Sequence, residues 1–365
     1  MWWLLFVALA VAAAQAALLG TWCLTRVAYE RSFGAAWAYE GEEVTLREVL
    51  TNRKLLPVPW LRAESRISQH LRFHKQSRPE IVDEREIQEG QYHRSAFFLP
   101  PMVRVTRTHR VMCAKRGFYD IGSVALTAGD LLGMTQRSRQ SEAPCQLTVY
   151  PRPLEMNELP LPSSRFLGEL LVKRFIMPDP YLVGGIRPMM PGDPLRDIHW
   201  GATAHSGQLQ VKLREFTADP RLLVILNVQM MEEQWAELMD YEQGVIEHGL
   251  RIAATLCARA LAAGVEAGFA SNGYLTGEPG APVFLPALRG PGALDALLSA
   301  MARLVIHRER TFPTFLSELR GISGMDILIL SAYDSDMIRQ QMAALQGQGN
   351  SVALQILEGE GVIAA

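Results

Sequence analysis

Residues 184–200, GGIRPMMPGDPLRDIHW, contain the densest mixture of charged, aromatic and turn-forming residues in the chain. The segment holds two arginines, two aspartates, one histidine and one tryptophan between turns rich in glycine and proline. Burial in a core does not favour this composition, because a charged group removed from water needs a partner. The segment is therefore either a site or a junction between structural units, and the sequence on its two sides indicates the fold to which it belongs.

On its C-terminal side, short apolar runs alternate with longer amphipathic stretches. Residues 221–228 form an almost continuous apolar run, which is typical of a strand buried on both faces of a parallel sheet. Residues 242–263 have the apolar spacing of a long helix. This alternation predicts an open α/β sheet within residues 184–365. We expect the further strands at 208–216, 265–271 and 326–331, and the further helices at 294–305 and 336–346.

On its N-terminal side, the pattern is that of short strands joined by turns. Residues 44–50 are rich in β-forming side chains, and the alternation over 103–113 predicts another strand with one buried face. Together they predict a small β-sandwich over residues 26–150. Residues 151–183 contain several prolines, which interrupt regular structure and predict a linker.

Residues 1–25 contain no charged side chain. As a helix this segment would reach roughly 37 Å, which exceeds the hydrocarbon core of a bilayer at about 30 Å. A secretory signal is the alternative, but it requires a basic region at its start, and none is present. One transmembrane helix is therefore favoured. Arg26 and Arg31 follow it, so the positive-inside rule places the body of the protein in the cytoplasm, beneath the plasma membrane.

Charge and cysteine content narrow the classes of partner. The formal net charge of the 365-residue chain is −2 at pH 7, and no basic run is present, which argues against a nucleic-acid partner. The four cysteines form no CxxC pair and indicate free thiols rather than a disulfide framework. The whole sequence thus predicts an α+β multidomain protein with a transmembrane helix, a small β-sandwich and an α/β domain.

Within residues 184–200 and the residues that follow, the order of side chains predicts a turn and then a short helix. Gly192 supplies the turn, Asp193 is expected to cap the helix, and Pro194 suits its first position. Gly207 is expected to end the helix in a left-handed conformation. Trp200 is expected to be buried, with an indole donor that needs a partner.

The charged residues of this segment permit two interpretations. Arg187 or Arg196 can pair with Asp193 or Asp197, which would form an ionic clasp that ties together linker, helix and sheet. The alternative is a hydrolase-like enzyme that uses Asp193, Asp197 and His199 for acid–base chemistry. Because no nucleophile accompanies these groups, the clasp or a partner-binding role is favoured, and no catalytic residue is assigned.

The segment resembles the signature of the bacterial family called domain of unknown function 58. The layout of the whole chain, from apolar N-terminus to α/β end, is similar to that family as well. The chain departs from the family pattern at Met189 and His205. The matching residues are Arg187, Gly192, Asp193, Pro194, Arg196, Ile198, His199, Trp200, Ala204, Leu209, Val211 and Lys212.

The resemblance implies a C-terminal domain similar to a von Willebrand factor A domain. It also implies association with a MoxR-type AAA+ ATPase, and so an adaptor role in the assembly or maturation of envelope or other protein complexes. The family has no established reaction. From the resemblance and residues 1–25 together, we expect a single-pass bacterial membrane protein with the lipid bilayer and this ATPase as partners.

Von Willebrand A domains can bind a divalent cation through an Asp-x-Ser-x-Ser sequence after the first strand. Hard cations prefer oxygen ligands, especially carboxylates. In this chain Asn227, Gln229 and Met231 stand at the three positions. An amide and a thioether are poor ligands for magnesium, so we expect neither a metal nor another cofactor.

Overall fold

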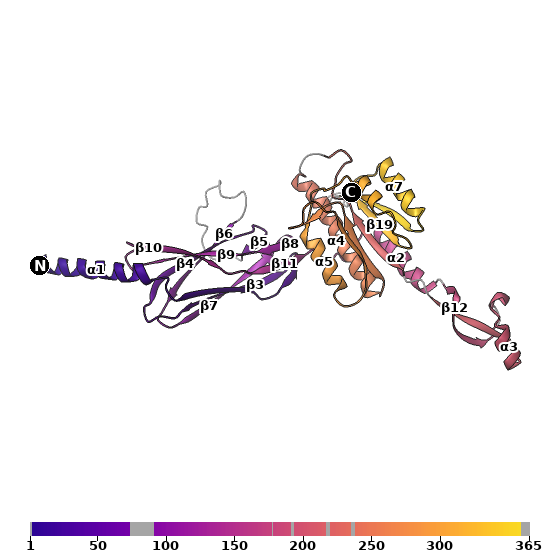
Figure 1. The fold of residues 1–365 in the computed structure, drawn as a ribbon, viewed down its shortest axis with the longest axis horizontal. Coiled ribbons are helices and arrows are strands. Elements are labelled where there is room, and N and C mark those ends of the chain that lie inside the picture. Colours follow the sequence, from indigo (N-terminus) through magenta and orange to yellow (C-terminus); the bar gives the residue numbers. More distant parts are fainter. Residues whose placement is uncertain are drawn as a thin grey trace. The chain divides into compact units, whose positions relative to one another are not determined.

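The structure is a computed structural model that describes residues 2–73, 91–176, 178–190, 193–216, 220–234 and 238–358. The chain divides into two compact units, Met1–Arg152 (unit 1) and Pro153–Ala365 (unit 2), and each is described by itself (Figure 1). The described residues form a mixed α/β protein with several sheets and one apolar N-terminal helix.

Unit 1 begins with helix α1, and strands make up the rest of its regular structure. Helix α1 (Trp2–Trp22) is the one described helix long and apolar enough to cross a membrane. The strands are β1 (Val27–Phe33), β2 (Trp37–Tyr39), β3 (Glu43–Asn52), β4 (Val58–Ile67), β5 (Leu71–Phe73), β6 (Gln91–Leu99), β7 (Arg104–Cys113), β8 (Gly117–Asp120), β9 (Ser123–Gly129), β10 (Gln136–Glu142) and β11 (Gln146–Tyr150).

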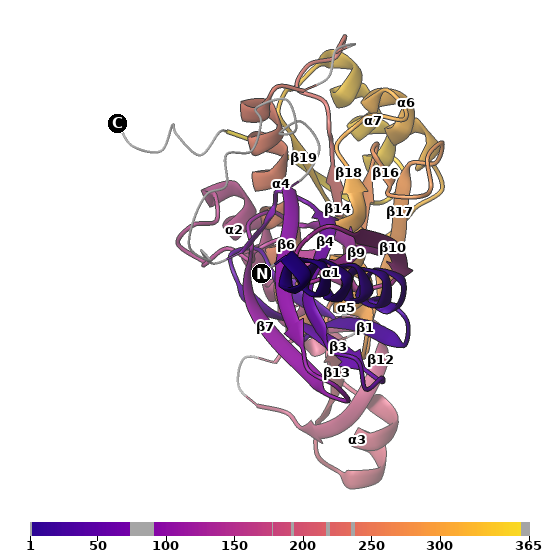
Figure 2. The same ribbon diagram turned by 90° about the vertical axis from the view of Figure 1, so that its left-hand side faces the viewer.

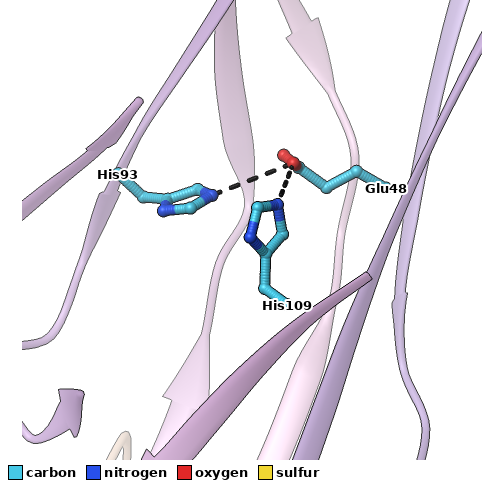
Figure 3. A group of neighbouring side chains, drawn as sticks. All are labelled: Glu48, His93 and His109. Carbon is cyan, nitrogen blue, oxygen red and sulfur yellow. Dashed lines mark hydrogen bonds and ion pairs between the residues drawn. The ribbon is translucent and has the colours of Figure 1, made fainter. Parts of the chain in front are cut away.

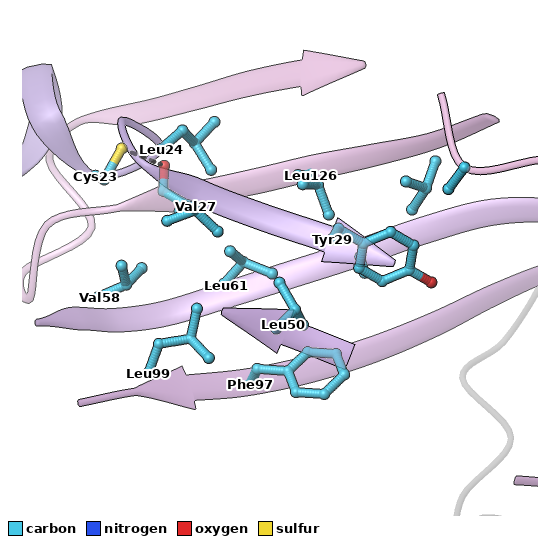
Figure 4. Packing of buried hydrophobic residues seen from close by; sticks show 14 residues of the cluster. Cys23, Leu24, Val27, Tyr29, Leu50, Val58, Leu61, Phe97, Leu99 and Leu126 are labelled. Carbon is cyan, nitrogen blue, oxygen red and sulfur yellow. Dashed lines mark hydrogen bonds between the residues drawn. The ribbon is translucent and has the colours of Figure 1, made fainter. Parts of the chain in front are cut away.

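Two four-stranded antiparallel sheets form the body of unit 1. One has the order β1-β3-β7-β5 and the other β10-β9-β4-β6, while β2, β11 and β8 form a smaller sheet. Leu50 from the first sheet packs with Leu61, Phe97 and Leu126 from the second in one buried cluster (Figure 4). Since every second residue of these strands is buried, the two sheets lie face to face around a shared core.

The residues that directly follow α1 are part of this core. Cys23 and Leu24, which follow the helix, belong to the same cluster as Leu50 (Figure 4). Lys54, in the turn after β3, donates from Nζ to the carbonyl oxygens of Trp22 and Thr25, at 2.9 Å each, and also to that of Cys23. These carbonyls lie at and just beyond the C-terminal end of the helix, where no further turn supplies N–H groups, and the buried lysine caps them. The carbonyl of Trp22 also accepts the N–H and the hydroxyl of Thr25.

Unit 2 is built around a five-stranded sheet with the order β17-β15-β14-β19-β20. All neighbouring strands are parallel except β15 and β17. Its elements are α2 (Leu161–Ile176), β12 (Pro178–Pro188), α3 (Trp200–Ser206), β13 (Gln210–Phe216), β14 (Arg221–Leu226), α4 (Asp240–Ala262), β15 (Glu266–Ser271), β16 (Tyr274–Leu275), β17 (Val283–Leu288), α5 (Ala293–Arg303), β18 (Leu304–Val305), α6 (Phe312–Glu318), β19 (Asp326–Ser331), α7 (Asp336–Gln346) and β20 (Ser351–Ile356).

The centre of this sheet is the apolar run predicted from the sequence. Residues Leu222 to Leu226 of β14 are fully buried, as a strand covered on both faces requires. Leu223 and Ile225 pack with Phe312 and Phe315 of α6, while α4 contacts β14 and β15. The alternation of strands and helices after residue 220 agrees with the α/β arrangement expected from the sequence.

Residues 151–183, predicted as a linker, contain helix α2 and the beginning of β12. Pro160 precedes α2 and Pro162 lies in its first turn, where the missing proline N–H costs nothing. Ser163 donates to Gln355 on β20 at 2.7 Å, and Leu170 is buried. Pro160 and Pro162 therefore mark the start of a helix rather than an irregular linker, and Pro178 and Pro180 lie in β12.

The Lys54 contact yields a test of how α1 is joined to unit 1. Replacing Lys54 with methionine removes the donor to these buried and partly buried carbonyls, and we expect the free energy of unfolding of unit 1 to fall by about 1–3 kcal/mol. The exposed neighbour provides a control, since Arg53→Met should change it by less than about 0.5 kcal/mol. Urea denaturation of the full chain in detergent measures both variants. Equal effects would contradict the role of Lys54.

Candidate functional site

The charged segment described first, residues 184–200, lies in a hairpin that has a small helix at its closed end. Strands β12 and β13 pair antiparallel, with Arg187 opposite Val211. Helix α3 lies between them in the sequence and beside them in space (Figures 1 and 2). We call β12, α3, β13 and their connection the arm. Gly192, one of the signature residues, lies outside the described residues.

Arg187 and Asp193 form a two-pronged ion pair within the arm. Nη1 and Nη2 of Arg187 donate to the two carboxylate oxygens of Asp193, both at 2.7 Å. The backbone N–H of Met190 donates to the same carboxylate at 2.7 Å. The bond from Arg187 lowers the pKa of Asp193, and the amide of Met190 lowers it further. Of the pairings that the sequence permitted, the structure thus shows this one, and it closes the turn after β12.

The predicted helix start at Asp193 is wrong. Residues Leu195–Asp197 form one 3-10 turn, and Ile198 then bridges to Val211 in extended conformation. Helix α3 begins at Trp200, and its cap is His199, whose Nδ1 accepts from the N–H of Ala202 at 3.0 Å. Asp193 cannot cap a helix because its carboxylate is held by Arg187. Gly207 ends α3 with a φ of 70°, in the left-handed conformation expected of it.

The prediction that Trp200 is buried is also wrong, since its exposed fraction is 68%. Ile198 bridges to Val211 just before α3, and the seven-residue helix itself contains no buried residue. Arg196 is exposed as well and makes no part of the Arg187 pair. Five large apolar side chains of the arm are exposed and define what we call the arm surface: Ile186, Met190, Leu195, Trp200 and Leu209.

At the carboxyl ends of β14, β15 and β19, the structure brings together a neutral polar network. Asn227 donates from Nδ2 to Ser331 at 3.0 Å and accepts the N–H of Gln229 at 3.0 Å. Oε1 of Gln229 accepts from Asn272 and from the N–H of Phe312. These amides are buried and satisfied by one another, so the network ties the strand ends together. Met231, the third position of the degenerate cation sequence, is exposed.

Unit 1 contains a polar cluster that the sequence analysis missed, formed by Glu48, His93 and His109 (Figure 3). Glu48 lies on β3 and His109 on β7 of one sheet, whereas His93 lies on β6 of the facing sheet. Oε2 of Glu48 lies 2.8 Å from Nε2 of His109 and 3.8 Å from Nε2 of His93. The cluster therefore joins the two sheets through their shared interior.

Two hydroxyls complete the cluster. Tyr29 donates to Oε1 of Glu48 at 2.6 Å, and Ser95 donates to Oε2 at 2.7 Å. Burial by itself raises the pKa of Glu48, but the bonds from His109, His93, Tyr29 and Ser95 outweigh it and hold the pKa well below its usual range. The carboxylate therefore stays ionised in the core, surrounded by four donor groups.

Two imidazoles and a carboxylate are ligands that zinc accepts, and their three ligand atoms lie within 4.8 Å of one another. Oγ of Ser95, however, lies 2.7 Å from Glu48 Oε2, 3.1 Å from His93 Nε2 and 3.4 Å from His109 Nε2. The hydroxyl thus occupies the space that a cation bound by all three residues would need. Hydrogen bonds account for the geometry, and we interpret the cluster as an ionic link between the sheets.

The signal for this cluster was present in the sequence as a break in an alternation. In β3, the residues Val44, Leu46, Glu48 and Leu50 point inward, so a carboxylate stands in a row of apolar side chains. His93 and His109 likewise occupy inward positions of their strands. Because 45 and 61 residues separate them from Glu48, no local spacing rule connects them.

No family model matches the chain, and no curated protein matches it. Some solved structures resemble about a third of it. A non-cellulosomal cohesin from the archaeon Archaeoglobus fulgidus is 9% identical over 33% of this chain and 90% of its own, with a TM-score of 0.23. PapD-like domain 7 of human CEP192 is 13% identical over 34% and 85%, with a TM-score of 0.22. The CARDB domain of the PF1109 protein from Pyrococcus furiosus, in complex with di-metal ions, is 11% identical over 34% and 93%, with a TM-score of 0.21.

The cluster makes the stability of unit 1 dependent on pH. Replacing Glu48 with glutamine removes the negative charge to which the surrounding hydroxyl and imidazole groups bond. We expect the free energy of unfolding of unit 1 at pH 7 to fall by about 3–5 kcal/mol. Since the folded state lowers the pKa of Glu48, its contribution is present above the ordinary carboxyl pKa of roughly 4.3 and is lost as the pH falls below it.

The difference between the wild-type chain and Glu48→Gln should therefore shrink as the pH is lowered below about 4, as measured by urea denaturation across pH. Glu30→Gln is the matched control, because Glu30 is exposed on the neighbouring strand and its contact with Arg104 is 3.9 Å long. A Glu48→Gln effect that equals that of the control would refute the ionic link.

The Arg187–Asp193 pair yields a local test. Asp193→Ala should release the turn after β12 with only a small effect on overall stability, because both side chains are partly exposed. Hydrogen exchange should quicken at the amide of Met190, which loses its acceptor. Arg196→Ala, which removes an exposed arginine outside the pair, should leave that amide unchanged. If the amide of Met190 exchanges at the same rate in both variants, the Arg187–Asp193 pair does not hold the turn.

Proposed function

We propose that the chain is a membrane-anchored adaptor that binds a MoxR-type AAA+ ATPase and acts in the assembly or maturation of envelope or other protein complexes. The observation that carries this proposal is the arm surface. Large apolar side chains gathered on an exposed element are typical of protein-binding sites, and tryptophan is enriched among the residues that contribute most to such binding. The resemblance of the arm to the family signature supports the choice of partner.

The architecture of unit 2 also supports this proposal. A mainly parallel sheet with helices on both of its faces is the arrangement that a von Willebrand A-like domain requires. The neutral network around Asn227 and Gln229 favours a version of that domain that binds partners without a cation, because its amide groups already satisfy one another.

The proposed ATPase is a cytoplasmic enzyme, so unit 2 must lie on the cytoplasmic side. Helix α1 is apolar enough to cross a bilayer, and the exposed arginines that follow it, Arg26 and Arg53, favour this orientation. Arg31 contributes less to this argument than the sequence suggested, because it is buried and donates to the carbonyl oxygens of Ala143 and Ile121.

The same geometry weighs against the hydrolase alternative. The carboxylate of Asp193 is held by Arg187, and its lowered pKa makes it a weak general base. Nδ1 of His199 already accepts the N–H of Ala202. Two of the three proposed catalytic groups are therefore committed to holding the backbone of the arm.

Affinity capture from bacterial membranes tests the adaptor role. The full chain in mild detergent should retain a AAA+ ATPase, whereas the double variant Leu195→Ser and Trp200→Ser should lose most of it. Met337→Ser, which changes an exposed residue of α7, is the matched control and should retain it. The bait must keep the end of α1, because Cys23 and Leu24 belong to the core of unit 1. Failure of the full chain to enrich any AAA+ ATPase, or equal capture by the double variant, would contradict the proposal.

A further inference from the structure

The loop between β9 and β10, residues 130–135, is bound to the second half of α1. Nε2 of Gln15 donates to Asp130 at 3.2 Å, and Oγ1 of Thr135 donates to the carbonyl oxygen of Ala16 at 3.2 Å. A side chain at Gly20 would collide with Thr135, so the helix and the loop are in close contact there as well. The loop therefore lies beside residues 15–20 of the helix, within its last two turns.

This contact sets the depth of the loop if α1 crosses a bilayer. A helix of 21 residues is roughly 31 Å long, which only just matches a hydrocarbon core of about 30 Å. Crossing therefore needs the whole of α1, including the residues that touch the loop. Any position of the helix that spans the bilayer consequently brings the loop into contact with the membrane surface.

The side chains of this loop suit that position. Leu131, Leu132 and Met134 are 70%, 61% and 68% exposed, although a loop in water usually presents polar residues. The carboxylate of Asp130 points inward and accepts the N–H groups of Leu132 and Thr135 in addition to Gln15. Its charge is thus satisfied within the protein, and the loop presents its apolar side chains outward.

Two further turns lie at the same end of unit 1. The N–H of Arg53 donates to the carbonyl oxygen of Arg26, and the N–H of Met102 donates to that of Lys54, so both turns adjoin the exit of α1. Leu55 is 84% exposed and Met102 65%. Among residues 22–26, 52–56, 100–104 and 130–135, Asp130 is the only acid, while Arg26 and Arg53 are exposed.

We propose that these loops form a membrane seat, in which Leu131, Leu132, Met134 and Leu55 insert into the bilayer interface beside α1. The exposed arginines would contact anionic lipid headgroups. This inference rests on the membrane anchoring in the proposed function and adds a second contact with the bilayer. Unit 1 would then stand on the membrane in a fixed orientation, with α1 and the seat as its two supports.

Depth-dependent fluorescence tests the seat in the full chain. Leu132→Cys is labelled with nitrobenzoxadiazole and reconstituted into vesicles of phosphatidylcholine and phosphatidylglycerol. The native cysteines Cys23, Cys113, Cys145 and Cys257 are all buried, so the label goes to the exposed new thiol. Ser123→Cys is the matched control, because Ser123 is exposed at the other end of β9, about 20 Å away along the strand.

The label at position 132 should emit at shorter wavelength than the label at 123, and lipids that carry a doxyl group should quench it more strongly. If the chain floats with the vesicles but the two labels behave alike, the seat is wrong while the anchor stands. If the chain does not float with the vesicles, the membrane anchoring fails and the seat fails with it.

Discussion

The exit of α1 is held by cationic side chains that donate to backbone carbonyls, and these bonds join the helix to the β-sandwich of unit 1. Lys54 reaches the carbonyls of Trp22 and Thr25 from the β3–β4 turn. Arg139 on β10 reaches those of Leu24 and Val27 at 3.3 and 2.8 Å. Since Lys54 comes from the turn that joins the two main sheets and Arg139 comes from strand β10, the connection between helix and sandwich is fixed from two sides. An apolar helix that ended in a free linker would leave the sandwich no set orientation at the membrane.

Each unit also contains a buried polar group at a position where its strands would otherwise present apolar side chains. In unit 1 the group is the charged Glu48, and its donors come from both sheets. In unit 2 the groups are the neutral Asn227 and Gln229, which link the ends of three strands. A polar group in the core costs free energy unless every partner is in place, so such clusters favour one register over its neighbours. The charged cluster carries the larger penalty when a partner is lost, and its carboxylate makes the stability of unit 1 depend on acid pH.

The parts of this fold that could be predicted from the sequence are those in which one local pattern dominates. The apolar run of β14, the strand β19 and the helix α7 were placed correctly because each has an unbroken periodicity. The start of α3 was not, because Asp193 suits both a helix cap and an arginine partner. A helix cap stabilises a helix by about 1 kcal/mol. The ion pair of Asp193 with Arg187, together with the bond from the N–H of Met190, competes successfully with capping. The Glu48 cluster could not be assembled from the sequence, since it requires the register of strands far apart in the chain.

The arm surface and the membrane seat share one structural device. In each, a carboxylate accepts backbone N–H groups of its own turn: Asp193 holds the amide of Met190, and Asp130 holds those of Leu132 and Thr135. The acid therefore folds inward, and the apolar neighbours are left to face outward. A turn fixed in this way loses little conformational freedom when its apolar side chains enter a partner or a bilayer, so more of the burial free energy remains for binding. Exposed apolar residues on unrestrained loops would lose that advantage, so in the proposed binding we expect the two aspartates to contribute by holding the turns.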